Sequence, residues 1–169
     1  MPEPTASAGE HYSRLISEQL DNERAIKASL EQRGIAVVAT AGTLVTLLFA
    51  LGALVTRSQT FEPPAASVVF LLLALLAFLA ASVAAIATNR VRTYEEVKIG
   101  ALRVLLDENL WAAESSIGER RAAEVRVAIL AIARNQNAKK AKSLKWAMRS
   151  EVTAVGLVAI AVAAILLAN

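Results

Sequence analysis

Residues 65–88 read AASVVFLLLALLAFLAASVAAIAT, a stretch without any charged side chain. At 1.5 Å per residue, a helix of this length crosses a hydrocarbon core of roughly 30 Å. Two further apolar blocks accompany it, residues 35–56 and the segment that follows Glu151. Too little polar chain remains in 169 residues to cover three such blocks in water. We therefore expect an all-α integral membrane protein with three transmembrane helices.

The first block begins after a polar arm of 34 residues, and it is too long for the apolar region of a signal peptide. We expect it to be a retained span. The N-terminal residues 1–9, rich in Pro, Ala, Ser and Gly, are predicted to be disordered. Residues 10–34 are predicted to form a cytoplasmic helix, which can run on into the first span because no proline lies between His11 and Val55.

The central segment is predicted to be a helical hairpin with a basic juxtamembrane end. The helix of the second span is expected to continue past Arg90, and a second helix is expected over residues 119–135. With the N-terminal helix, this hairpin could form a small cytoplasmic bundle. The predicted divisions of the chain are 1–9, 10–34, 35–56, 57–64, 65–88, 89–150 and 151–168.

Lysine and arginine are distributed very unevenly around the three blocks. The connection 57–64 contains one of them, whereas residues 1–34 contain four and residues 90–150 contain thirteen. Because positively charged flanks stay in the cytoplasm, this pattern places the N-terminus and the central segment inside the cell. The short connection 57–64 and the C-terminus are then external.

Small residues recur in the spans at steps of three and four, which brings them onto one helix face. In lipid, such residues let helices approach closely and pack. The pattern leaves open whether the contacts lie within one chain or between chains, and a general abundance of alanine is the alternative explanation. The predicted packing residues are Ala39, Gly42, Thr43, Thr46 and Ala50, then Ala74, Ala77, Ala81 and Ala84, then Gly156, Ala159 and Ala163.

Residues 139–149, KKAKSLKWAMR, precede the third span. Trp146 is a residue type that anchors helices at a membrane interface. The lysines suit anionic headgroups, which attract each basic residue by about 1 kcal/mol near the surface. A positively charged cytoplasmic flank is the simplest interpretation, and a specific phosphate site is the alternative.

Several function classes are disfavoured. The chain has no cysteine and a single histidine, His11, so we expect no metal site and no cofactor. No phosphate-binding loop or catalytic motif is present, and too few aromatics accompany the basic residues for nucleic-acid binding, so we expect no enzymatic activity and no nucleic-acid partner. The spans contain no ionisable residue, which argues against a transporter. We expect the hydroxyls of Thr40, Thr43 and Thr46 to bond to their own helix.

Two motifs resemble a known family. The first is Glu31-Gln32-Arg33-Gly34-Ile35 followed by Ala41-Gly42, and the second is the hydrophobic 129–133 followed by the basic 139–144 and the last span. They resemble the entry motif, basic turn and final membrane helix of the bacterial Pycsar transmembrane effectors and the related SLATT-type effector domains. Ala41 departs from the asparagine usual in that family.

The resemblance implies an antiphage effector of the bacterial inner membrane. A cyclic nucleotide would bind its cytoplasmic part, and the protein would assemble as a homo-oligomer that breaches the membrane. The alternative is a non-enzymatic structural or regulatory membrane protein whose cytoplasmic helices bind a partner protein, and a small channel is a third possibility. By charge and position, the candidate phosphate or lipid contacts are Arg33, Arg134, Lys139, Lys140, Lys142 and Lys145.

Overall fold

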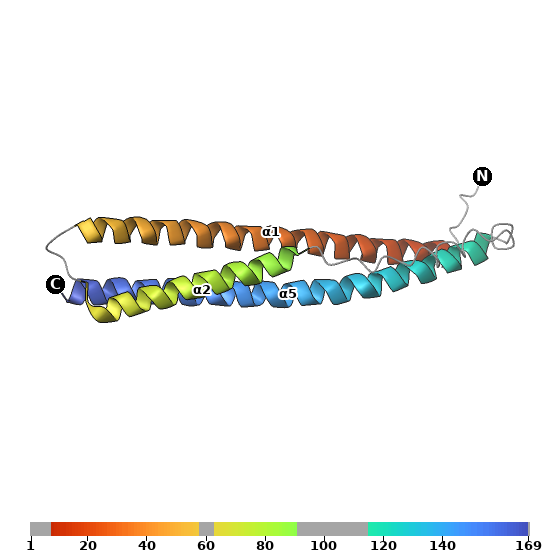
Figure 1. The fold of residues 1–169 in the computed structure, drawn as a ribbon. Helices are drawn as coiled ribbons and strands as arrows, with labels where there is room; N and C mark the ends of the chain where they lie inside the picture. The colour runs from red at the N-terminus through yellow and green to blue at the C-terminus, as the bar shows by residue number, and fades with distance from the viewer. Residues whose placement is uncertain (1–7, 58–62, 91–114, 169) are drawn as a thin grey trace, which may run out of the picture. The chain divides into compact units, whose positions relative to one another are not determined.

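The computed structural model describes residues 8–57, 63–90 and 115–168 of the chain. This part of the chain is helical: α1 runs over Ala8–Arg57, α2 over Ala65–Asn89 and α5 over Ser115–Leu167 (Figure 1). All three helices are long and apolar enough to cross a membrane. The prediction of an all-helical chain with three such helices is thus confirmed for the described residues.

Two of the three helices each join several of the predicted segments. α1 joins the predicted cytoplasmic helix and first span without a break, and it begins at Ala8 rather than at residue 10. α5 likewise joins the predicted helix 119–135, the basic segment and the third span into one helix of 53 residues. No proline or glycine interrupts residues 119–155, and alanine, lysine, arginine and glutamine are all good helix formers, so nothing in this segment ends the helix.

The prediction that the second span's helix continues past Arg90 is wrong. α2 ends at Asn89, and Arg90 has an extended backbone with φ −58° and ψ 123°. The rest of that predicted helix falls in residues 91–114, outside the described residues. Most of the predicted disordered arm and the middle of the predicted external loop, residues 1–7 and 58–62, lie outside them as well.

The chain divides into two units. We call the first the polar unit; its described residues are 8–29 and 115–139. We call the second the apolar unit; its described residues are 30–57, 63–90 and 140–168. α1 and α5 each contribute a segment to both units.

In the apolar unit, α1 and α5 run parallel and α2 runs antiparallel to them (Figure 1). Glu31 of α1 pairs with Lys140 of α5, and further along, Thr40 pairs with Glu151. Residue numbers therefore rise in the same direction along both helices. In contrast, Gly34 lies beside Asn89, whereas Ala41 packs with the earlier Phe78. This order is the one that three successive crossings of a layer would produce.

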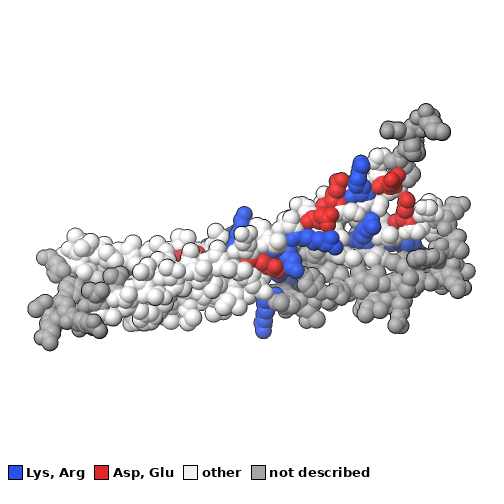
Figure 2. Space-filling model, turned by 90° about the horizontal axis from the view of Figure 1, so that it is seen from above, with Lys and Arg blue, Asp and Glu red and all other residues white. Residues whose placement is uncertain are grey.

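The interior of the apolar unit is built largely from small residues. Ala81, Ala85 and Ala147 are fully buried in one cluster with Val37 and Leu144. A second cluster joins Ala41, Phe78 and Ala154. Most of the large aliphatic side chains of this unit are exposed, and the surface of its apolar segments is almost uniformly white in Figure 2. The unit is therefore more apolar outside than a protein that folds in water, which fits a lipid surrounding.

The buried and half-buried residues of α5 recur at alternating steps of four and three from Arg126 to Ile165. Those of α1 recur in the same way from Ser13 to Leu48. This spacing, 3.5 residues on average, keeps one face of each helix turned toward its neighbour along both units. The same positions carry different chemistry in the two units.

Candidate functional site

The α1–α5 contact of the polar unit is held chiefly by hydrogen bonds. The Arg126 guanidinium donates to the hydroxyls of Ser13 and Ser17, at 2.7 and 3.2 Å. Only Leu20 and Leu130 are buried apolar residues among the described residues of this unit. Half-buried apolar side chains such as Ile129 and Ile132 lie beside these hydrogen bonds, and the polar geometry fixes which residues face each other.

Glu23 is the centre of this polar contact. Arg134 donates from Nε to its carboxylate at 3.2 Å, and from Nη2 to Gln19 at 3.1 Å. The amide of Asn137, itself buried, donates both to the Glu23 backbone carbonyl at 2.9 Å and to its carboxylate at 2.8 Å. The Glu23 side chain is only 12% exposed, and these donors replace the water that it loses.

A second charged contact lies in the apolar unit, where its helices begin to be apolar. The Lys140 ammonium pairs with the Glu31 carboxylate, and the Lys140 side chain is 7% exposed. One turn further along α1, Gly34 allows close approach of α2. A Cβ on Gly34 would lie 3.2 Å from Nδ2 of Asn89 and 3.3 Å from the backbone oxygen of Ala85. Oδ1 of Asn89 is buried and has no hydrogen-bond partner among the described residues.

A groove between α1 and α5 lies in the same part of the apolar unit. It has a volume of about 680 Å³ and is open on one side. Three cationic side chains line it, one from α1 and two from α5, and none of them forms an ion pair with a described residue. Apolar side chains complete the wall. The residues that define this basic groove are Leu30, Arg33, Lys145, Met148, Arg149 and Val152.

Glu151 stands between Arg149 and Val152 in the sequence but does not line the groove, and it accepts a hydrogen bond from the hydroxyl of Thr40 on α1. Its carboxylate therefore reaches a residue of the first apolar block. The hydroxyls of Thr40, Thr43 and Thr46 each donate to the carbonyl four residues earlier, at 2.9 Å. The prediction that these hydroxyls bond to their own helix is confirmed, with Glu151 as an additional acceptor for Thr40.

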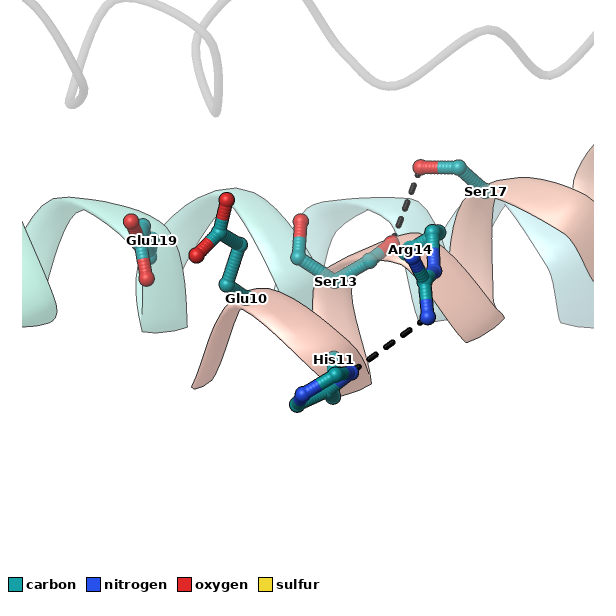
Figure 3. Close-up of a pocket in the computed structure, with 6 residues that line it drawn as sticks. All are labelled: Glu10, His11, Ser13, Arg14, Ser17 and Glu119. Carbon is teal, nitrogen blue, oxygen red and sulfur yellow. Dashed lines mark hydrogen bonds between the residues drawn. The ribbon is translucent and has the colours of Figure 1, made fainter. Parts of the chain in front are cut away.

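A pocket of about 370 Å³ lies in the polar unit near the start of α1 (Figure 3). Arg14 donates to Nδ1 of His11 at 3.4 Å, and Ser17 donates to the backbone oxygen of Ser13 at 2.9 Å. His11, Glu10 and Glu119 point in different directions (Figure 3). They do not converge as metal ligands must, and the described residues contain no group of three or more such side chains that could hold a metal ion.

The six predicted phosphate or lipid contacts have separate surroundings. Arg33 and Lys145 line the basic groove. Arg134 and Lys140 are instead engaged by Glu23 and Glu31. Lys139 and Lys142 are exposed and lie outside the groove. Arg149 was missing from the predicted set, although it is one turn after Lys145 on the same helix face and its spacing could have identified it.

The predicted packing residues also separate into two groups. Ala74 and Ala81 are buried in the apolar unit, and Ala77 and Ala84 are partly buried against its clusters. The residues of the first and third spans are exposed on the single chain, and Gly42 and Gly156 have no atom of a neighbouring segment within 4 Å of an added Cβ. Packing at these positions stays a prediction, for contacts between chains. The exposed residues are Ala39, Gly42, Thr43, Thr46, Ala50, Gly156, Ala159 and Ala163.

Comparison of the chain with protein-family models, with curated proteins and with solved structures finds no match. The class of protein therefore rests on the chain itself. The described residues contain three helices able to cross a membrane and a polar unit built on two of them.

Proposed function

We propose that the protein is a non-enzymatic protein of the bacterial inner membrane, with a cytoplasmic N-terminus and an external C-terminus, that acts by assembling with copies of itself in the bilayer. In this proposal, a cytoplasmic signal such as a cyclic nucleotide acts on the polar unit, and the assembled spans perturb the membrane as an antiphage effector does. The proposed orientation rests on the uneven distribution of basic residues.

The observation that carries the proposal is the unused face of α1. Thr43, Thr46 and Ala50 each follow a buried residue, Gly34, Val37 and Ala41, by nine positions. At about 100° per residue, nine positions correspond to two and a half turns, so these small residues lie opposite the face used within the chain. A helix in lipid can use such a second face to pack against another copy.

The polar unit supports a triggered rather than a permanent assembly. Its α1–α5 contact depends on hydrogen-bonded charges at Glu23, Arg126 and Arg134 and on few buried apolar groups. Polar contacts of this kind fix register at a cost in stability. A charged ligand that competes for the same groups would therefore shift the arrangement of the two helices at a modest cost in free energy.

Site-directed cysteine cross-linking tests the assembly, because the natural chain has no cysteine. Thr46→Cys, on the unused face, is expected to give disulfide-linked dimers in oxidised membranes. Ala81→Cys, fully buried within the chain, is the matched control and is expected to stay monomeric. Equal cross-linking of both variants, or of neither, would contradict assembly through this face.

Membrane potential tests the effector activity. Cells that express the protein are expected to lose their potential only when a suitable cyclic nucleotide is present. A variant with Gly42→Ile and Thr46→Ile, which fills the small face with branched side chains, is expected to keep the potential intact at the same protein level. An unchanged potential under every nucleotide would reject the effector role.

A second candidate function is supported by exposed apolar residues of the polar unit. Tyr12, Leu15 and Ile26 are 65, 55 and 39% exposed and fall on one side of α1. Such a stripe suits the binding of a helix from a partner protein. A regulatory protein of this kind would co-purify with a stable partner, and Leu15→Glu with Ile26→Glu would release that partner without affecting membrane insertion.

A further inference from the structure

We propose that the basic groove of the apolar unit binds an anionic phospholipid with two phosphates, a lipid of the cardiolipin class. Arg33, Lys145 and Arg149 would hold the phosphates, and an acyl chain would lie along Met148 and Val152. The proposal requires only that the apolar helices lie in a bilayer, and it is independent of the effector activity proposed above.

The charge of the groove is the first reason. Its three cations come from two different helices and face one cavity, and none of the three has an ion-pair partner among the described residues. The two acids nearest to them in sequence are engaged elsewhere, Glu31 by Lys140 and Glu151 by Thr40. The groove therefore presents three cations that no described carboxylate pairs with, and basic pockets between membrane helices suit anionic headgroups.

The depth of the cations is the second reason. Lys145 and Arg149 are four residues apart, which is about 6 Å along a helix and close to the thickness of one headgroup layer. Trp146, an interfacial residue type, lies between them and is 58% exposed. Arg33 precedes the first apolar residue, Ile35, by two positions. All three cations thus mark the level at which phosphates of a surrounding bilayer would lie.

The apolar part of the groove distinguishes a lipid from a soluble phosphate. Leu144 is buried beneath it, and Met148 and Val152 continue it toward the apolar end of α5, with Val152 72% exposed. This apolar path suits an acyl chain. A free phosphate or a nucleotide would leave the same apolar side chains in contact with water.

The number of cations favours two phosphates over one. A single phosphodiester carries one negative charge and would leave most of the positive wall uncompensated. The guanidiniums of Arg33 and Arg149 can each form paired hydrogen bonds with the oxygens of one phosphate. Lys145 adds a point charge between them along the sequence.

The test measures how much lipid stays bound to the full-length protein. The protein is reconstituted in phosphatidylcholine bilayers that contain either cardiolipin or phosphatidylglycerol at equal total charge, and retained lipid is counted by native mass spectrometry. Arg33→Gln with Lys145→Gln and Arg149→Gln is expected to lower cardiolipin retention about tenfold or more. The matched control, Arg24→Gln with Arg120→Gln and Arg121→Gln, removes equal charge from exposed positions of the polar unit and is expected to retain cardiolipin as the natural protein does.

Equal loss of cardiolipin from both triple variants would overturn the proposal, as would equal retention of phosphatidylglycerol by the natural protein. Displacement of the bound lipid by inorganic phosphate or by a soluble cyclic dinucleotide would assign the groove to a soluble ligand instead. If the triple variant fails to insert into membranes, Arg149→Gln alone carries the same test, with Arg120→Gln as its control. Lipid retention is measured without any toxicity readout, so its failure is distinct from failure of the effector role.

Discussion

The polar unit and the apolar unit are built on the same two helices with the same spacing of contact positions, yet they fill those positions with different chemistry. In the polar unit, Arg126 and Asn137 of α5 face serines and Glu23 of α1. In the apolar unit, Ala147 and Ala154 of α5 pack in clusters with Val37 and Ala41 of α1. The contact face of α1 and α5 is thus polar in one unit and made of small apolar residues in the other.

In the proposed arrangement the polar unit lies in water, where burial of apolar surface is the main driving force for contacts. The chain instead uses charged hydrogen bonds there, which specify a register at lower stability. In a lipid surrounding the hydrophobic effect gives helices no reason to associate, and small residues permit the close van der Waals contact that replaces it. In the proposed arrangement, one repeat of contact positions thus serves in water and in lipid because the side chains at those positions change.

The largest effect on stability is expected at the buried ion pair of Glu31 and Lys140, a charged contact within the apolar unit. Glu31→Leu would leave the Lys140 ammonium buried without its partner, at a cost of about 3 kcal/mol in the free energy of unfolding. Glu31→Leu combined with Lys140→Met is expected to recover most of that loss. Unfolding by sodium dodecyl sulfate, followed by tryptophan fluorescence, measures both, and a double variant as unstable as the single one would refute the buried ion pair.

A smaller effect on stability is expected when two glycines of α1, Gly34 and Gly42, are replaced by leucine. Gly34→Leu would force a side chain against Asn89 and the backbone of Ala85, whereas a Cβ added at Gly42 has no atom of a neighbouring segment within 4 Å. Both changes raise helix propensity alike, so their difference isolates the contact. We expect Gly34→Leu to be less stable by about 2 kcal/mol in the same unfolding experiment. Equal stability would show that α2 does not approach α1 at this point.

The polar unit should respond more weakly to the loss of a single contact. Asn137→Ala removes two hydrogen bonds to Glu23, and we expect a loss of about 1 kcal/mol in helix-pair stability. Asn135→Ala, at an exposed position of the same helix, is the control and should change little. Amide hydrogen exchange along residues 19–27 reports this stability, and equal protection in both variants would argue against the hydrogen-bonded contact.

The smallest effect is expected at exposed ion pairs of the polar unit. Arg121 donates to Glu124 at 2.9 Å within one turn of α5, and both side chains are largely in water. Such pairs contribute no more than about 0.5 kcal/mol. Arg121→Ala should therefore leave hydrogen exchange of the polar unit unchanged, and a loss as large as that of Asn137→Ala would mean that surface charge, rather than buried hydrogen bonding, holds this unit together.

The sequence predicts the three apolar helices well, because length and the absence of charge are local properties. It predicts their packing faces only in part. In α1, small residues occur both on the buried face, at Gly34 and Ala41, and at exposed positions, at Gly42 and Thr46. Periodicity alone cannot distinguish these faces, since the choice depends on which helices lie alongside.

The candidate site was predictable to a similar extent. Charge and position identify Arg33 and Lys145, and both line the groove. The same criteria also select Lys140, which pairs with a glutamate 109 residues earlier in the chain. Pairings at such separation depend on the parallel register of α1 and α5, which no local pattern contains. For the same reason, the contact between Glu151 and Thr40 was not foreseen.

The parallel course of α1 and α5 has an electrical consequence. Each helix carries a macrodipole equivalent to about half an elementary charge of opposite sign at its two ends. Within the apolar unit, the peptide dipoles of the antiparallel α2 cancel those of one of the two parallel helices, so the dipoles of one helix segment remain unbalanced there. In the proposed orientation its positive end lies on the negative side of an energised membrane, a stabilisation of at most about 1 kcal/mol per 100 mV. Loss of the cell's voltage would remove this stabilisation, even though the spans carry no charged side chain.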